Sequence, residues 1–364
     1  MKIGLVAVAV GLLLIACSPD EAAPTTASPV TTAATTTTAT ARVSTTTTQT
    51  TAVTTTPIET TTTTIGPAPV TGVEEYPIPG SRPHDVAVAP DGSVWYTAQR
   101  SGSLDRLDPS TGEVEQVPLG TGAAPHGVIV GPDGDAWVTD QGLNGLVRVE
   151  HETLDFEVYR APAEVSMHTA VFAPDGILWF TGQAGYVGRF DPESEQMDLY
   201  ETGGGGPYGI TVTPGGDVYY AALAGSYIAR VDPASGQITR FDPPTPDQGA
   251  RRVWTDSGGR IWVSYWNTGH LAVYDPGDDS WREWSLPGEA PQAYAVYVDE
   301  TDRPWVSDFG GNHALLRFDP LTETFESFDL PTPGGEVRQI LGRPGEVWGG
   351  ESAADALVVI RYDG

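Results

Sequence analysis

Cysteine and lysine are almost absent from this 364-residue chain, which contains one of each, Cys17 and Lys2. A single cysteine excludes an internal disulfide framework and a cysteine-rich metal site. Positive charge is scarce as well, because 48 Asp and Glu residues outnumber 19 Lys and Arg residues and leave a net charge of −29. This excess argues against nucleic acid and against an anionic membrane surface as direct partners.

The one long apolar run stands at the N-terminus, in residues 3–16. Its 14 residues are too few for a membrane span, which needs about 20. The run follows Lys2 and ends in Leu14-Ile15-Ala16-Cys17, which resembles the bacterial lipobox. We therefore expect residues 1–16 to be a signal peptide and Cys17 to be lipidated, so that a lipid anchor alone holds the protein on the outer side of the cytoplasmic membrane. The alternative is a secreted protein with an incidental cysteine.

Residues 18–72 are rich in Thr, Ala and Pro, and they lack the apolar periodicity that a folded core requires. We expect residues 17–72 to comprise the lipidated cysteine and a disordered stalk. The remaining residues, 73–364, have a different composition and form the expected globular domain. We expect this domain to be a monomer.

One pattern recurs seven times in this domain, and residues 83–97 and 125–139 are its clearest copies. An aromatic residue marks each copy and recurs every 40 to 43 residues: Trp95, Trp137, Trp179, Tyr219, Trp262, Trp305 and Trp348. Each copy contains four short alternating segments separated by Gly, Pro and Asp turns. This period and content predict an all-β, seven-bladed β-propeller with four-stranded blades.

The last copy lacks its fourth segment because the chain stops at Gly364. Residues 73–79, before the first copy, resemble the fourth segments at 281–287 and 325–331. We therefore expect the strand 73–79 to complete the last blade, which removes an exposed sheet edge.

Candidate site residues fall at two repeated positions of each blade. The residue 11 positions before the anchor, here called the axial residue, begins the first strand: His84, His126, His168, Tyr208, Arg251 and, in blade six, Gln292 or Tyr294. The residue three positions after the anchor ends the second strand: Ala98, Asp140, Gly182, Ala222, Tyr265, Asp308 and Glu351. Because neighbouring strands run in opposite directions, both positions lie on one face of the propeller.

Imidazoles near carboxylates supply general bases and ligands for a divalent cation. We expect His84 and His126 to be catalytic and Asp140, Asp308 and Glu351 to bind metal. His168, Tyr208, Arg251 and Tyr265 are expected to contact a small-molecule or peptide ligand at the central opening. The alternative is that duplication copied the histidines and that they only cap strands.

Residues 179–181, residues 185–190 and Pro125-His126-Gly127 resemble the streptogramin B lyase (virginiamycin B lyase) family across residues 73–364. The resemblance implies Mg²⁺-dependent elimination at the ester of a cyclic depsipeptide, a carbon–oxygen lyase reaction. It places the paired histidines at His84 and His126. Where the family has a glutamate before the second histidine, this chain has Ala124, and Asp140 takes the place of a second glutamate.

Three functions remain open from the sequence. The first is the lyase, with Asp140 holding the metal that polarises a carbonyl. The second is a non-catalytic surface propeller that binds a ligand or a protein, which the lost carboxylate favours. The third is a metal-dependent hydrolase like the gluconolactonase-type propellers, for which no matching metal set is visible.

Overall fold

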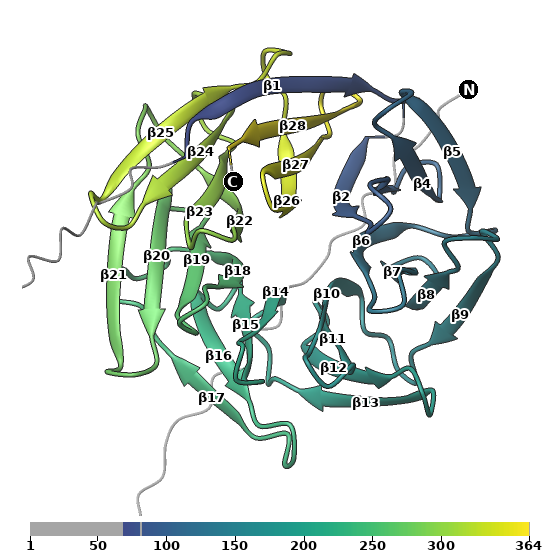
Figure 1. The fold of residues 1–364 in the computed structure, drawn as a ribbon. Helices are drawn as coiled ribbons and strands as arrows, with labels where there is room; N and C mark the ends of the chain where they lie inside the picture. Colours follow the sequence, from purple (N-terminus) through teal and green to yellow (C-terminus); the bar gives the residue numbers. More distant parts are fainter. Residues whose placement is uncertain (1–67, 81, 364) are drawn as a thin grey trace, which may run out of the picture. The chain divides into compact units, whose positions relative to one another are not determined.

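The computed structural model describes residues 68–80 and 82–363, and within these residues it is an all-β seven-bladed propeller (Figure 1). Seven antiparallel four-stranded sheets surround one axis, as the sequence predicts. The expected signal peptide, Cys17 and nearly all of the expected stalk lie outside the described residues. No helix in the described part of the chain is long and apolar enough to cross a membrane.

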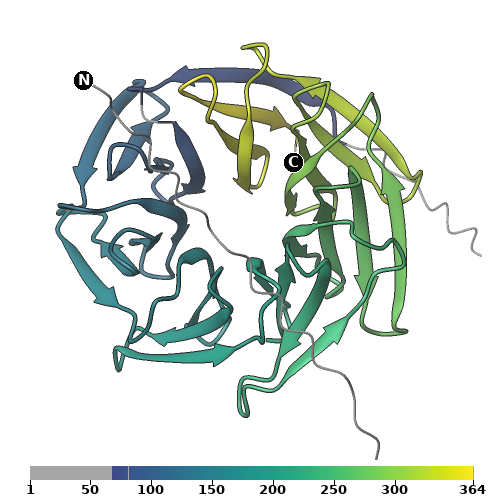
Figure 2. The ribbon, with the colours of Figure 1, turned by 180° about the vertical axis from the view of Figure 1, so that it is seen from behind.

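The four strands of each blade follow one another from the axis to the rim, and Figure 2 shows the same order from behind. The innermost strands are β2 (Pro83–Val88), β6 (Pro125–Val130), β10 (Met167–Phe172), β14 (Pro207–Val212), β18 (Ala250–Thr255), β22 (Ala293–Val298) and β26 (Val337–Arg343). The second strands are β3 (Val94–Ala98), β7 (Ala136–Asp140), β11 (Leu178–Gly182), β15 (Val218–Ala222), β19 (Ile261–Tyr265), β23 (Pro304–Asp308) and β27 (Glu346–Glu351). The third strands are β4 (Ser103–Asp108), β8 (Gly145–Val149), β12 (Tyr186–Asp191), β16 (Tyr227–Val231), β20 (His270–Asp275), β24 (Ala314–Asp319) and β28 (Ala356–Tyr362). The rim strands are β5 (Glu113–Pro118), β9 (Phe156–Arg160), β13 (Gln196–Glu201), β17 (Ile238–Phe241), β21 (Ser280–Ser285), β25 (Thr324–Asp329) and β1 (Val70–Pro77).

The N-terminal strand closes the ring, as the sequence predicts. β1 pairs with β28 from Val70 opposite Tyr362 to Pro77 opposite Ala356, so blade seven contains strands from both ends of the domain. The ring of Tyr76 lies 5.5 Å from the ring of Trp348, the anchor of that blade. β1 begins at Val70, three residues before the expected boundary, and its pairing contains an irregularity between Val70 and Gly72.

The repeated aromatic anchors form the core of the blades, and each is at most 3 % exposed. In most blades an aromatic residue of the rim strand stacks on the anchor, for example Tyr159 on Trp137 at 5.8 Å and Phe328 on Trp305 at 5.4 Å. Such contacts add roughly 0.5–1.5 kcal/mol to the burial of each ring. The anchors therefore hold the rim strand against the second strand.

A bulge in every innermost strand shapes the axial face. In all seven described blades the register between the first and second strands shifts just after the strand begins. In blade one the bulge leaves the backbone N–H of Asp85 without a ladder partner, and that N–H donates to Thr97 Oγ1 at 3.0 Å. The Thr97 hydroxyl donates in turn to the carbonyl of His126 in the next blade at 2.8 Å. A hydroxyl residue two positions after the anchor thus links neighbouring blades.

Candidate functional site

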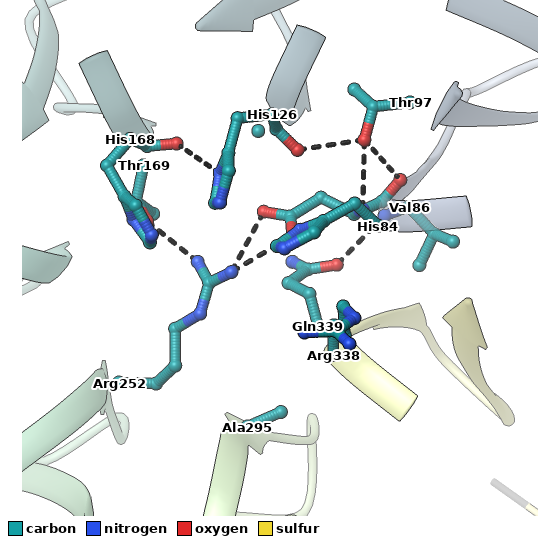
Figure 3. Close-up of polar contacts among 12 residues, drawn as sticks. His84, Val86, Thr97, His126, His168, Thr169, Arg252, Ala295, Arg338 and Gln339 are labelled. Carbon is teal, nitrogen blue, oxygen red and sulfur yellow. Dashed lines mark hydrogen bonds and ion pairs between the residues drawn. The ribbon is translucent and has the colours of Figure 1, made fainter. Parts of the chain in front are cut away.

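The bulges bring axial residues of neighbouring blades together, and the three histidines lie side by side in a row (Figure 3). The ring of His126 lies 3.9 Å from the ring of His84 and 3.9 Å from the ring of His168. Tyr208 continues the row, with its ring 3.7 Å from the ring of His168. The sequence-predicted residues His84, His126, His168 and Tyr208 therefore do lie together.

One ring nitrogen of each histidine is already engaged. Nδ1 of His126 lies 3.1 Å from the carbonyl oxygen of His168, and Nδ1 of His168 lies 3.2 Å from the carbonyl oxygen of Tyr208 and 2.8 Å from the Thr169 hydroxyl. A carbonyl only accepts, so Nδ1 carries the proton and Nε2 keeps its lone pair in the neutral ring. Nδ1 of His84 lies 2.7 Å from Asp85 Oδ1. The row thus presents Nε2 atoms that can accept a proton.

Burial keeps these imidazoles neutral. It lowers the pKa of His84, His126 and His168 well below 6.5, and Arg252 lowers that of His84 further. The exposed fraction falls from 8 % for His84 to 5 % for His126 and 1 % for His168. The first two histidines are therefore more accessible to a ligand than His168, which continues the row beside His126.

A second layer of residues closes the axis beneath the histidines. Arg252 of β18 reaches across to Asp85 of β2, with Nη2 2.9 Å from Oδ1, and its Nη1 donates to Thr169 Oγ1 at 2.7 Å (Figure 3). Both charged side chains are nearly inaccessible, at 4 % and 2 % exposure. Gly127 leaves room for this layer, because a Cβ there would lie 2.7 Å from the carbonyl oxygen of His168. The ion pair of Asp85 and Arg252 therefore links two blades across the axis next to the histidines.

Aromatic residues surround Arg251 on the other side of the opening. The guanidinium carbon of Arg251 lies 4.5 Å from the ring centre of Tyr208, 4.6 Å from that of Trp266 and 3.6 Å from that of Tyr294. Of the two residues proposed for blade six, Tyr294 is the one in this row, since its hydroxyl lies 3.0 Å from that of Tyr208. Arg251 therefore lies in the same row as Tyr208 and Tyr294, and its contact with a ligand stays a prediction.

Two of the predicted metal ligands bind loop backbone instead of facing the histidines. Both carboxylate oxygens of Asp140 accept the N–H of Ala124, at 2.9 and 3.1 Å, and Oδ1 also accepts that of Leu143 at 2.8 Å. Asp308 Oδ1 accepts the N–H groups of Gln292 and Gly310. These carboxylates fix the turns after the second strands. Tyr265, predicted to contact substrate, is fully buried in blade five.

The third predicted ligand, Glu351, forms a carboxyl pair with Glu75 of β1. Burial, followed by the charge of Glu75 and a hydrogen bond to it, raises the pKa of Glu351 to about 8. Both oxygens of Glu351 and Oε1 of Glu75 are buried with no donor other than a carboxyl proton. One proton shared between the two groups satisfies them, so Glu351 is protonated at neutral pH.

A Glu351→Gln variant should therefore change how stability depends on pH. In the native protein Glu351 keeps its proton up to pH about 8, whereas in the unfolded chain it ionises above pH 4.5. The unfolded state binds fewer protons in this window, so native stability falls as pH rises from 4.5 to 8. The variant should lack this slope and be more stable by roughly 2–4 kcal/mol at pH 8. Urea unfolding from pH 4 to 9 of the native protein, of Glu351→Gln and of the exposed control Glu115→Gln measures this slope. Stability curves against pH that are parallel for Glu351→Gln and the native protein would contradict the pairing of Glu351 with Glu75.

The residues present do not suit Mg²⁺. In the described residues, one group of imidazole and carboxylate side chains is close enough to share a metal ion. It consists of His84, Asp85 and His126, whose ligand atoms lie within 4.8 Å of one another. Two nitrogens and one oxygen form a possible metal-binding group, but Mg²⁺ requires mostly oxygen donors. Asp85 is moreover bonded to Arg252 and His84. The guanidinium of Arg252 is thus the resident cation beside the histidines.

The model of the virginiamycin B lyase family matches residues 29–280. The chain belongs to this family. No curated protein matches it. Among solved structures, virginiamycin B lyase from Staphylococcus aureus is similar with a TM-score of 0.74 and 18 % identity over 80 % of this chain and 99 % of that one. A streptogramin B lyase is similar with a TM-score of 0.73 and 20 % identity, over 80 % of this chain and 98 % of that one.

A further propeller, YCF48 bound to D1 peptide, is similar with a TM-score of 0.64 and 14 % identity, over 80 % of this chain and 95 % of that one. At these identities the likeness shows the fold that family members share. The virginiamycin B lyase family membership and the propeller predicted from the repeat thus agree.

Sequence reasoning missed the second layer and much of the aromatic cluster. Asp85 and Arg252 directly follow axial residues, so opposite charges at equivalent positions were a readable signal for the ion pair. Arg338 is the axial residue of blade seven and lies 5.8 Å from the ring centre of Tyr294. It was missed because the turn between β26 and β27 is shorter and places it 10 residues before Trp348.

Proposed function

We propose that the protein is a lyase that acts by elimination at the axial face of the propeller. The observation that carries this proposal is the row of neutral imidazoles with Nδ1 anchored, because it leaves Nε2 of His84 and His126 available as a general base. A base beside a carbonyl removes the neighbouring acidic proton, and the leaving oxygen then departs. Membership of the virginiamycin B lyase family supports a cyclic ester or depsipeptide as the substrate class.

Arg252 supplies positive charge beside this base. Its guanidinium is fixed by Asp85 and Thr169, so it needs no reorganisation when negative charge develops on a carbonyl oxygen. His126 is the preferred base, since it lies between two other imidazoles and keeps some exposure. The proton that His126 removes is the one returned to the leaving oxygen, and His84, oriented by Asp85 at its Nδ1, lies beside His126 to contact the substrate.

Incubation of the protein with a streptogramin B antibiotic tests the proposal. Elimination gives a linear product of unchanged mass, whereas hydrolysis adds the mass of one water. Parallel reactions with Mg²⁺ and with EDTA test the metal that the family resemblance implies. Turnover that survives EDTA fits the donor set described above, and turnover that requires Mg²⁺ would contradict it.

The His126→Ala variant should lose activity by about 10²–10⁴-fold, the usual contribution of a general base. The matched control is His270→Ala, because His270 binds Thr268 and Ser285 and is no part of the row. In the native protein kcat/KM should stay level as pH falls through 6.5, since the row is protonated only well below that value. Equal rates in His126→Ala and His270→Ala would rule out this base.

A non-catalytic binding propeller is the second candidate. Ala124 stands where the resemblance implies a glutamate, and Asp140 is used by loop backbone. A binding protein would show saturable binding with no product in the mass assay.

We further propose that the protein is anchored by lipid at Cys17 on the outer side of the cytoplasmic membrane. The lipobox-like residues 14–17 and the apolar run before them support this location. A Cys17→Ser variant expressed in bacteria should leave the membrane fraction, which fractionation and immunoblotting measure. If that variant remains in the membrane fraction like the native chain, the anchor is not at Cys17.

A further inference from the structure

Arg251 is a buried cation that lacks an anionic partner. Three arginines in the described residues are buried, and two of them pair with a carboxylate: Arg252 with Asp85 and Arg317 with Glu326. Arg251, at 9 % exposure, has no carboxylate within ion-pair distance, and its Nε has no hydrogen-bond partner. A buried charge is costly unless it is paired. Arg251 therefore differs from the other two buried arginines in having no carboxylate partner among the described residues.

The surroundings of Arg251 hold the guanidinium without neutralising it. Its Nη2 donates to the Tyr208 hydroxyl at 2.6 Å, and the rings of Trp266 and Tyr294 flank it. Phe309 extends this cluster, with its ring 4.4 Å from that of Tyr294 and 5.7 Å from that of Trp266. We call Tyr208, Arg251, Trp266, Tyr294 and Phe309 the Arg251 cage. Trp266 and Phe309 are partly exposed and give the cage an apolar wall at the opening.

Positive charge exceeds negative charge around the cage. Arg338 lies 5.5 Å from the ring centre of Phe309 and pairs with Glu336, while Arg252 pairs with Asp85. Arg251 therefore remains as the uncompensated charge, in a protein whose net charge is −29. The guanidinium groups of Arg251, Arg252 and Arg338 lie over the rings of Tyr208 and Tyr294 and give the cage a positive local field. Such a field attracts an anion into the opening.

We propose that the Arg251 cage is a binding subsite for a ligand carboxylate that is carried on a flat aromatic or acyl body. The carboxylate pairs with the guanidinium of Arg251, whose planar set of N–H donors matches a carboxylate. The flat body lies against the partly exposed rings of Trp266 and Phe309.

The position of the cage connects this subsite to the histidines. Tyr208 belongs to the cage and also contacts the ring of His168 at 3.7 Å. A ligand held at Arg251 therefore extends along the row toward His126 and His84. If the protein is the proposed lyase, this subsite defines the substrate class as an ester that also bears a carboxylate.

Calorimetric titration of the whole protein with benzoate and with benzamide tests the subsite at constant ionic strength. These probes share size and flatness and differ in charge. We expect benzoate to bind at least about tenfold more tightly than benzamide, because a carboxylate–arginine pair in a desolvated site is a strong contact. Equal affinities, or no binding of benzoate, would overturn the subsite. Binding is measured without turnover, so it can fail or succeed independently of the lyase assay.

Substitutions of Arg251 and of nearby arginines show where benzoate binds. Arg251→Gln should weaken benzoate binding at least about tenfold, since it removes the charge that pairs with the carboxylate. The matched control is Arg82→Gln, because Arg82 is exposed yet close enough to lower the pKa of His84. This variant should change the affinity for benzoate less than about twofold, since a surface charge is screened by solvent. If Arg251→Gln does not fold, Arg251→Lys and Arg338→Gln take its place in the test. Each of these two variants should weaken the binding of benzoate but not the binding of benzamide. Benzoate affinity unchanged in both would overturn the proposal.

Discussion

Replacing Arg252 with methionine should destabilise the protein by about 3–5 kcal/mol, the usual cost of removing one partner from a buried ion pair. Methionine fills much of the space of the arginine stem, so the loss comes from burying the Asp85 carboxyl without its cationic partner. That carboxylate is 2 % exposed and lies at the axis, where water has little access. At roughly 2–4 °C per kcal/mol for a domain of this size, the melting temperature should fall by about 10 °C.

The pH dependence separates the lost charge from lost packing. Burial already raises the pKa of Asp85, and Arg252 opposes that rise. Without Arg252 the folded state holds a proton on Asp85 that the unfolded state releases above pH 3.8. The unfolded state then binds fewer protons, so the variant should lose more stability at pH 8 than at pH 5.

Two further variants control this experiment. Arg148→Met removes an arginine that pairs with Asp133 and Asp135 at 33 % side-chain exposure, and it should cost no more than about 1 kcal/mol. The double variant Asp85→Val with Arg252→Met removes both charges and should recover most of the loss. A small loss in Arg252→Met, equal to that in Arg148→Met, would show that the axial pair does not stabilise the fold.

A chain that starts at residue 82, and therefore lacks β1, should melt more than about 10 °C lower than the native chain or precipitate. It loses the backbone pairing with β28, and each hydrogen bond contributes roughly 0.5–1.5 kcal/mol. It also exposes the edge of β28 and the Trp348 ring that Tyr76 covers. An exposed strand edge pairs with other chains, so aggregation should accompany the loss.

A synthetic peptide of residues 68–79 should restore stability to the truncated chain, because it can add the missing strand to the open sheet edge. The matched control is the same peptide with Tyr76→Ala, which keeps the backbone pairing and loses the contact with Trp348. Thermal unfolding with increasing peptide measures the rescue. A truncated chain that melts like the native chain would show that blade seven is complete with three strands.

The fold could be predicted because the repeat is visible in single residues. The anchors Trp95 to Trp348 recur at a nearly constant spacing, and residues 73–79 resemble other rim strands. The start of β1 at Val70 could not be predicted, since Val70 to Gly72 pair irregularly and carry no anchor. The linking hydroxyls, such as Thr97, were present two positions after the anchors, but their role depends on the bulge opposite them.

The site was predictable only where equivalent positions of neighbouring blades meet. His84, His126 and His168 are adjacent because identical positions of consecutive blades lie side by side. The pair of Asp85 and Arg252 joins blades one and five, and the only sequence signal for it is opposite charge at equivalent positions of two blades that are not neighbours. Asp140 could not be assigned either, since its partners are backbone groups whose direction depends on the loop conformation.

The bulge shared by the innermost strands affects how the propeller can evolve. In five of the seven blades a hydroxyl two positions after the anchor accepts the backbone N–H that follows the axial residue, so these blades share a backbone frame whose hydrogen bonds involve no axial side chain. Substitution at a single axial residue therefore alters the chemistry of the ring while these hydroxyl bonds remain, and at His126 or His168 it also removes a bond to the next blade's carbonyl. A new ligand specificity can therefore arise by separate substitutions of the axial residues of the seven blades.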